Sequence, residues 1–238
     1  MIGLCDMRSF YCSCEKVFRP DLRDAGVVVL SNNDGCIVAC DEIAKAAGIQ
    51  KFAPYFKQRA LIERAGLYAF SSNYELYGEV SARIMQRLST LAPNELEIYS
   101  IDECFIDFGG MPPEQLKPVA RSLRDTIWKE QRIRMGVSLA PTKTLAKLGQ
   151  YATKKIPKIQ GVCVLEQPHQ WQWLAERVSV SEVWGIGRRL TQKLNFLGMH
   201  AAADLAAMNE ADAKALQGIT LVRTIQELNG EPVIDIQY

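Results

Sequence analysis

Two adjacent carboxylates, Asp102 and Glu103, interrupt an otherwise apolar run that ends at Gly109 and Gly110. The run is typical of a β-strand closed by a turn, and successive strand residues point to opposite faces of a sheet. In a regular strand, one of the two acids would therefore face the core. An unpaired carboxylate there is costly and usually becomes neutral or binds a metal. The alternative is a hairpin turn with both carboxylates in water.

A third acid, Asp6, ends a short apolar run at the start of the chain. If this strand lies beside the strand that carries Asp102, three carboxylates from two strands converge. Such hard oxygen ligands suit Mg²⁺, which binds a few carboxylates together with substrate phosphates. Two ions about 3.5–4 Å apart would clamp the attacking and leaving oxygens of a phosphoryl transfer. The pattern therefore favours a two-metal site for phosphoryl transfer.

The elements that must position these acids are short apolar strands interspersed with amphipathic helices. Strands are expected over 1–6, 26–30, 36–40, 67–70, 96–99, 103–108, 133–139 and 162–165. Helices are expected over 10–18, 41–47, 54–65, 72–91, 113–130 and 142–153. The turn signal at 31–35 predicts that 26–40 forms a hairpin. Beyond about residue 166 only short helices are expected, over 167–175, 188–197, 201–207, 210–216 and 221–228, as a small all-helical subdomain.

The overall composition is that of an ordinary soluble globular protein, with a formal net charge of only +1. The distribution of charge is more informative. Residues 132–165 contain no acidic residue, but they contain the basic residues Arg132, Arg134, Lys143, Lys147, Lys154, Lys155 and Lys158. This stretch is either a solvated helix face or a phosphate-binding surface.

The cysteines indicate the compartment. There are seven, an odd number without framework spacing, and the two histidines sit in no ligand pattern. Free, mostly buried thiols in a reducing compartment are expected. The sequence has neither a signal-peptide pattern nor an apolar run long enough to span a membrane, so a cytoplasmic protein is predicted.

A Gly-x-Gly turn at 185–187, followed by Arg188 and Arg189, joins two of the short helices. Backbone amides exposed at a helix N-terminus can hold a nucleic-acid phosphate without reading sequence. The alternative is a tight helix–helix turn that needs glycine for a positive φ.

Several motifs together resemble the Y-family (translesion) DNA polymerases. They are Cys5-Asp6-Met7 with Phe10-Tyr11 and Cys14-Glu15, Ser100-Ile101-Asp102-Glu103, the stretch from Ala140 to Lys147, and Trp184-Gly185-Ile186-Gly187. The stretches 18–22, 30–36 and 70–77 resemble the UmuC branch, the catalytic subunit of bacterial DNA polymerase V. The similarity runs from residue 1 to about 235.

The resemblance implies an α+β right-hand polymerase core. A ferredoxin-like palm with a mixed sheet would comprise residues 1–24 and 73–165, and small α/β fingers would comprise 25–72. Residues 166–232 would form an all-helical thumb with a helix-hairpin-helix-like element. Residues 233–238 would begin the linker to a little-finger domain that the chain lacks, so the chain looks truncated after the thumb.

The resemblance also implies roles for single residues. Asp6, Asp102 and Glu103 would be catalytic and would bind two Mg²⁺ ions with the backbone carbonyl of Met7. Tyr11, beside Phe10, would be a steric gate that excludes a 2′-hydroxyl; without the motif, Tyr11 would be taken as core filler. The other implied contacts are Lys45 and Lys154 to the triphosphate, and Gly185, Gly187 and Arg188 to the DNA backbone.

The implied activity is that of an error-prone DNA-directed DNA polymerase, a nucleotidyltransferase that extends a primer 3′-hydroxyl in DNA-damage (SOS) tolerance and mutagenesis. The implied partners are primed template DNA, deoxynucleotides, a UmuD′-like dimer and a RecA-like filament. Contact with a sliding clamp would be lost with the missing C-terminal region.

Four residues depart from the family pattern. Arg8 stands where the family usually has Asp or Asn, and a cation there would pair with Asp6 or a phosphate, or would disturb the site. Cys40, Glu42 and Ile43 replace the usual Arg, Ala and Glu. With the missing domain, these changes favour an alternative, a weak or inactive relative that binds damaged DNA or polymerase partners. A third possibility, another two-metal enzyme such as a nucleotide cyclase, fits the 185–187 turn poorly.

Overall fold

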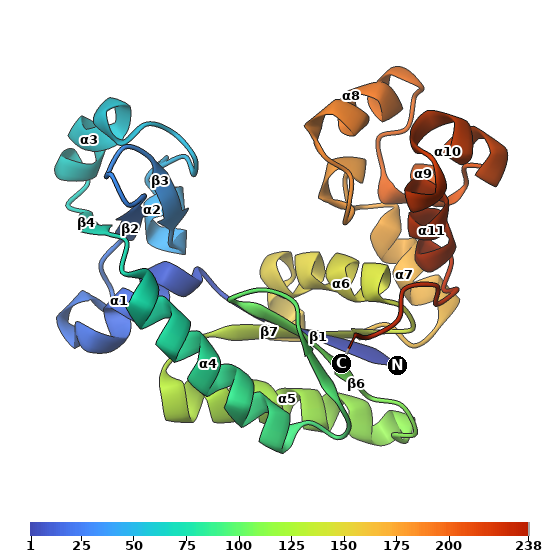
Figure 1. Ribbon diagram of the computed structural model, residues 1–238, viewed down its shortest axis with the longest axis horizontal. Coiled ribbons are helices and arrows are strands. Elements are labelled where there is room, and N and C mark those ends of the chain that lie inside the picture. Colours follow the sequence, from blue (N-terminus) through green and yellow to red (C-terminus); the bar gives the residue numbers. More distant parts are fainter. Residues whose placement is uncertain (238) are drawn as a thin grey trace.

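A five-stranded mixed sheet forms the centre of the protein in a computed structural model that describes residues 1–237 (Figure 1). Its strand order is β5 (Leu96–Ile98), β6 (Glu103–Asp107), β1 (Ile2–Met7), β7 (Met135–Ala140) and β8 (Val162–Val164). The pairs β5–β6, β6–β1 and β1–β7 are antiparallel, whereas β7–β8 is parallel. The expected α+β fold with a mixed sheet is confirmed.

Helices cover both faces of this sheet. Helices α4 (Tyr74–Leu91) and α5 (Pro113–Gln131) lie on one face, and α6 (Lys143–Lys155) lies on the other (Figure 1). Because β1 lies between two strands and two helical layers, its residues from Gly3 to Met7 are all buried. Leu4 packs in the cluster on the α6 side, and Cys5 packs in the cluster on the α4 and α5 side, as the alternation of a strand requires.

A second, three-stranded sheet lies beyond helix α1 (Phe10–Phe18) at one end of the molecule (Figure 1). Strand β2 (Val27–Leu30) pairs antiparallel with β3 (Ile37–Cys40) and parallel with β4 (Tyr68–Ser71). The expected hairpin over 26–40 is therefore confirmed. Helices α2 (Glu42–Ala46) and α3 (Tyr55–Arg64) complete this lobe. Asp41 begins α2 as its N-cap by accepting the Ala44 N–H.

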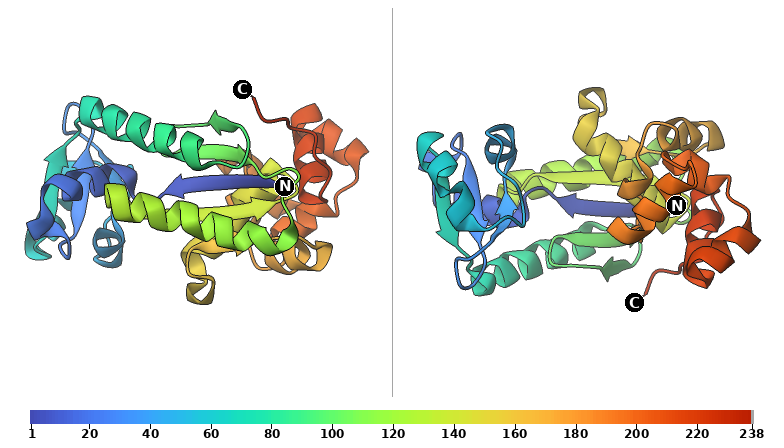
Figure 2. Two further views of the ribbon diagram at one scale, coloured as in Figure 1. Left: turned by 90° about the horizontal axis from the view of Figure 1, so that it is seen from below. Right: turned by 90° about the horizontal axis from the view of Figure 1, so that it is seen from above.

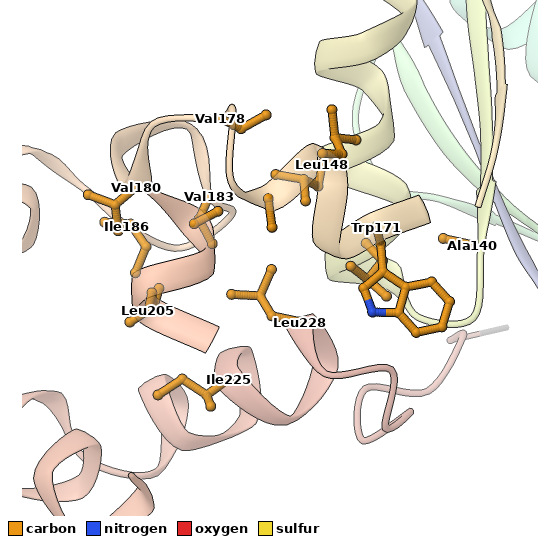
Figure 3. Close-up of a cluster of buried hydrophobic side chains, with 14 of the residues drawn as sticks. Ala140, Leu148, Trp171, Val178, Val180, Val183, Ile186, Leu205, Ile225 and Leu228 are labelled. Atoms are coloured by element: carbon orange, nitrogen blue, oxygen red, sulfur yellow. The ribbon is translucent and has the colours of Figure 1, made fainter. Parts of the chain in front are cut away.

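The opposite end of the molecule is all helical within the described residues. It contains α7 (Pro168–Ala175), α8 (Arg188–Phe196), α9 (Ala202–Ala206), α10 (Glu210–Gln217) and α11 (Ile219–Leu228). These helices share an apolar cluster with α6, in which Leu148 of α6 lies near Trp171 and Leu228 (Figure 3). The buried carboxylate of Glu227 also accepts the N–H of Thr144 at 2.8 Å, which fixes α11 to the first turn of α6.

The segment after α11 returns along the sheet (Figure 2). There the Gln237 N–H donates to the carboxylate of Glu97 at 2.6 Å. Of the expected linker over 233–238, residue 238 lies outside the described residues. Short 3₁₀ helices at Pro20–Leu22, Pro157–Ile159 and Val180–Glu182 were not expected from the sequence. Among the described helices, none combines the length and the apolar character that crossing a membrane requires.

Candidate active site

The three acids singled out in the sequence meet at one end of two neighbouring strands. Asp6 is the register partner of Glu103 in the antiparallel β1–β6 pair. Asp102 lies one residue before β6, and its carbonyl accepts the Met7 N–H at 2.9 Å. Asp102 is therefore not a residue of a regular strand. Because β6 begins only at Glu103, the strand alternation that would turn one of the two adjacent acids toward the core does not apply to this pair.

A cavity of about 460 Å³ opens at this strand end. Eight of the site residues expected from the sequence line it: Asp6, Met7, Phe10, Tyr11, Lys45, Asp102, Glu103 and Lys154. The other three, Gly185, Gly187 and Arg188, belong to the helical lobe and do not line it. The structure thus brings the acids, the aromatic pair and the two lysines together.

Two of the three acids pair with lysines of α6. Lys147 and Lys154 are seven residues apart, two helical turns, and therefore face the sheet on the same side. Lys154 Nζ lies 2.7 Å from Asp6 Oδ2. Lys147 Nζ lies 2.9 Å from both carboxylate oxygens of Glu103. Their acidic partners come from the sheet, which is why the stretch 132–165 needs no acids of its own.

Lys143, one turn earlier on α6, is one residue of the basic stretch that fits neither expectation. It is only 2% exposed, so it belongs neither to a solvated face nor to a phosphate-binding surface. Its ammonium donates to the Glu97 carboxylate and to the Asp235 carbonyl, both at 2.6 Å. Lys143 instead connects α6, the edge strand β5 and the C-terminal segment.

Burial sets the electrostatics of Glu103. Its pKa is raised, first by burial and then by the neighbouring charges of Asp6 and Asp102, while the hydrogen bond and charge of Lys147 oppose the shift. Asp102 is oriented differently, because the Ser100 hydroxyl donates to Asp102 Oδ1 at 2.8 Å. The two adjacent acids therefore differ in their hydrogen-bond partners, Lys147 for Glu103 and Ser100 for Asp102.

The donor set fits Mg²⁺ in its chemistry. Three carboxylates line one cavity and offer only hard oxygen donors, and two of them already bind an ammonium group. Within residues 1–237, no set of three His, Cys, Asp or Glu side chains is gathered closely enough to hold an ion as it stands. The lysines supply the positive charge that a divalent cation would supply to the same oxygens.

An aromatic cluster supports Tyr11. Its ring stacks on Tyr77 with centroids 4.5 Å apart and an interplanar angle of 16°. Tyr74 meets it edge-on at 5.7 Å, and Tyr77 is itself fixed because its hydroxyl donates to Glu15 at 2.6 Å. Phe10 is buried, and burial also raises the pKa of Tyr11. The roles of Tyr74 and Tyr77 were missed in the sequence, although their spacing of three at the start of α4 placed them on one helix face.

Two of the departures from the family pattern have visible consequences. Arg8 makes no ion pair with Asp6 within residues 1–237; Lys154 occupies that position, and the Arg8 guanidinium donates to the Thr153 carbonyl. Glu42 pairs with Lys45 at 3.0 Å at the exposed edge of the cavity. A negative charge therefore accompanies one of the two lysines expected to bind phosphates.

The Gly-x-Gly turn contacts the central sheet rather than the cavity. Gly185 has φ 84°, so the tight turn that requires glycine is present. Gly187 precedes α8 with no side-chain cap, which leaves amides at that helix N-terminus available. The Trp184 Nε1–H donates to the Tyr99 hydroxyl at 3.1 Å, and Lys147 Nζ lies 4.1 Å from the Tyr99 ring centroid. The turn is thus connected to the lysine that holds Glu103.

Comparisons with known proteins agree with this geometry. Residues 5–150 match the impB/mucB/samB family. Over its whole length the chain is 45% identical to protein UmuC of Salmonella typhimurium and 41% identical to protein MucB of Escherichia coli. Over 94% of the chain, the identity with DNA polymerase IV 1 of Bacillus subtilis is 29%. The chain spans 56% of the length of the first two relatives and 53% of the third.

Solved structures show the same fold. DinB from Sulfolobus solfataricus superposes with a TM-score of 0.79 at 26% identity, covering 98% of this chain and 69% of that one. The insertion ternary complex of Dbh DNA polymerase gives a TM-score of 0.80 at 26% identity, with the same coverage of both chains. The right-hand polymerase fold is therefore the fold of this chain.

Proposed function

The chain belongs to the impB/mucB/samB family, and on that premise we propose that it is the catalytic core of an error-prone translesion DNA polymerase. The reaction is template-directed transfer of a deoxynucleotide to a primer 3′-hydroxyl. The observation that carries the proposal is the cavity in which Asp6, Asp102 and Glu103 meet beside the ring of Tyr11. That arrangement combines ligands for hard cations with a flat aromatic face, and nucleotidyl transfer with sugar selection uses both.

The domains of the proposal follow the three parts of the fold. The palm is the five-stranded sheet with its helices, residues 1–24 and 73–165, and the fingers are the small sheet and its helices, residues 25–72. The thumb is the helical lobe, residues 166–232. The candidate cavity is lined from both of the first two parts, which suits a nucleotide bound between palm and fingers.

Asp6, Asp102, Glu103 and the Met7 carbonyl would hold two Mg²⁺ ions. When bound, the ions supply the positive charge that stabilises the transferring phosphoryl group and activates the 3′-hydroxyl. Lys147 favours the ionised form of Glu103, because its ammonium opposes the rise that burial causes in the pKa of that carboxyl.

The two lysines that contact acids of the site differ in exposure. The Lys154 side chain is 46% exposed, whereas the Lys147 side chain is 15% exposed. Lys154 can therefore leave Asp6 and bind the triphosphate of an incoming nucleotide, and Lys45 offers a second cation at the cavity edge. The ring of Tyr11 lies where it can exclude a 2′-hydroxyl by contact with the sugar.

DNA and protein partners belong to the proposal as well. The amides at Gly187 and the guanidinium of Arg188 suit a phosphate of the DNA backbone. One structural neighbour is the insertion ternary complex of Dbh DNA polymerase. The similarity to UmuC supports a role in SOS mutagenesis with a UmuD′-like dimer and a RecA-like filament. Because DNA is held there, we propose the bacterial cytosol as the place of action.

A second candidate function is DNA binding without transfer. The ion pairs Lys154–Asp6 and Lys147–Glu103 favour it, because each ammonium occupies carboxylate oxygens that a metal ion would need for the chemistry. The pair Lys45–Glu42 favours it too, since Glu42 repels a triphosphate.

Primer extension separates the two candidates. The chain, at high concentration, is incubated with a labelled primer–template, Mg²⁺ and each deoxynucleotide singly. The proposed polymerase adds the nucleotide complementary to the template, and removal of Mg²⁺ stops the reaction. Retention of the primer–template in an anisotropy titration, with no added nucleotide at any Mg²⁺ concentration, would support binding without transfer.

A further inference from the structure

A second and larger cavity, of about 1020 Å³, lies next to the candidate active site. It is enclosed by α1, the start of α2, the C-terminal end of α5 and the end of α6, and we call it the basic cavity. Arg8, Ser9, Glu42 and Lys154 line both cavities. The two cavities are therefore contiguous, and Arg8 lies at their junction.

The basic cavity has an excess of positive charge. Seven basic and four acidic side chains line it. The acids are largely used within the protein, because Asp41 pairs with Lys16 at 2.6 Å and Asp125 pairs with Arg124 at 2.7 Å. Glu42 pairs with Lys45, outside this cavity. Most of the local negative charge is thus already balanced.

Four arginines of the basic cavity have no carboxylate partner within residues 1–237: Arg8, Arg23, Arg132 and Arg134. Arg8 and Arg134 lie side by side at the ends of β1 and β7, because the Arg8 N–H donates to the Arg134 carbonyl at 2.8 Å. Like charges are therefore concentrated beside the junction.

Trp128 holds two of these arginines in place. The guanidinium carbons of Arg132 and Arg134 lie 5.7 Å and 5.6 Å from its ring centroid. Cation–π contact orders a guanidinium while leaving its N–H groups free to donate. Arg132 also has φ 58°, a left-handed conformation that few residues other than glycine adopt. The two guanidinium groups therefore lie against the same ring and face the same cavity.

We propose that the basic cavity binds a pyrophosphoryl group. Arginine forks bind phosphate oxygens in pairs, and a diphosphate offers several such oxygens in a small volume. The source is either inorganic pyrophosphate or the terminal phosphates of a nucleoside triphosphate. Each nucleotide that is transferred forms one bond from the 3′-oxygen to the α-phosphorus and breaks one α–β bond, so one pyrophosphate must leave. As a route for that product, the inference rests on the proposed function; as an anion site, it rests on the cavity alone.

Calorimetric titration of the whole chain with sodium pyrophosphate, without DNA or divalent metal, tests the site. The test variant is the double substitution Arg132→Gln, Arg134→Gln; both residues are exposed, so the fold should tolerate it. The matched control is Arg121→Gln, an exposed arginine of α5 that lies outside the cavity. Lys45→Gln tests binding in the candidate active site instead, since Lys45 lines only that cavity.

We expect pyrophosphate to bind the parent chain, and the double variant to bind it at least about ten-fold more weakly, as for the loss of one charge-assisted contact or more. Arg121→Gln should stay within about two-fold of the parent. Equal affinity in the parent and the double variant would overturn the proposal, as would a loss of binding in Lys45→Gln alone.

Titrations with a deoxynucleoside triphosphate and with orthophosphate distinguish the sources. Tighter binding of pyrophosphate than of the triphosphate identifies the free product as the ligand, and the reverse order identifies the nucleotide. Orthophosphate binding as tight as pyrophosphate binding would overturn the diphosphate assignment. Because no step of the titration needs catalysis, a chain that fails to extend a primer can still bind pyrophosphate here. Conversely, a chain that extends primers but binds no pyrophosphate in this titration would overturn the anion site without overturning the proposed polymerase activity.

Discussion

Asp6 and Glu103 face each other across the β1–β6 pair, and each is held by a different lysine of one helix. The two lysines are separated by two turns of α6, yet they pair with acids that lie directly opposite each other on neighbouring strands. One lysine is half exposed and the other is largely enclosed by Tyr99, Phe105 and Trp184. The enclosed one, Lys147, therefore acts as a positioning residue for Glu103.

Replacing Lys147 with methionine should shift the pH profile of extension to higher pH. Burial raises the pKa of Glu103 and Lys147 opposes it, so loss of the ammonium raises that pKa further. A reaction that needs ionised Glu103 is lost as the pH falls through its pKa, so the acid limb must move upward. Single-turnover rates measured from pH 5.5 to 9 would show this, with exposed Lys155→Met of the same helix as the control. An unshifted acid limb would remove Lys147 from this role.

Replacing Lys143 with methionine should destabilise the whole chain. The side chains of Lys143 and Glu97 are 3% and 12% exposed, so the change leaves an almost buried carboxylate without its cation. Breaking such a pair costs about 3 kcal/mol or more in the free energy of unfolding. Urea unfolding measures the loss, and exposed Lys158→Met should change stability by less than about 0.5 kcal/mol. Similar losses of unfolding free energy in Lys143→Met and Lys158→Met would show that the buried pair does not contribute to stability.

Replacing Tyr11 with alanine should admit ribonucleotides. The ring is held by stacking on Tyr77 and by the edge contact of Tyr74, so it cannot easily turn away from a 2′-hydroxyl. We expect the ratio of ribonucleotide to deoxynucleotide incorporation to rise on the order of 100-fold, equivalent to about 2.7 kcal/mol of discrimination. Tyr11→Phe keeps the ring and should keep the discrimination. If Tyr11→Ala and the parent discriminate equally between ribonucleotides and deoxynucleotides, Tyr11 serves only in packing.

Alkylation should mark one cysteine of the folded chain. Cys36 is exposed, whereas the other six cysteines are buried. Burial raises the pKa of Cys14 to about 12 and that of Cys163 to about 11. Since the thiolate is the reactive form, these two react only as the pH approaches those values. Iodoacetamide at pH 8 should add one label by mass spectrometry, and Cys36→Ser should take none. Rapid labelling of Cys163 would mean that the sheet edge opens.

The order of elements could be predicted from the sequence because each is local. Apolar runs and turn signals placed β1, the β2–β3 hairpin and the long helix α4 close to their observed ends. The meeting of Asp6 with Asp102 and Glu103 was predicted on the condition that their strands are neighbours, and β1 and β6 are neighbours. The resemblance to known motifs supplied the lysines and Tyr11 that complete the cavity.

The pairing of charges could not be predicted, because it depends on register between distant segments. Lys154 and Asp6 are 148 residues apart, and nothing near either residue specifies the other. The burial of Lys143 depends on the C-terminal segment lying along β5. The junction of the two cavities at Arg8 likewise becomes visible only once β1 and β7 are aligned.

The central claim is that the acids at the end of β1 and β6 perform metal-dependent nucleotidyl transfer. The most direct test is the single-nucleotide addition rate of Asp102→Asn beside Asp107→Asn. Both are in the β6 region, but Asp107 only closes a turn by accepting the Gly109 N–H at 2.7 Å. We expect Asp102→Asn to lower the rate by on the order of 1000-fold or more, about 4 kcal/mol of transition-state stabilisation, and Asp107→Asn to retain the rate of the parent. Equal rates for Asp102→Asn and the parent would show that these acids do not perform the transfer.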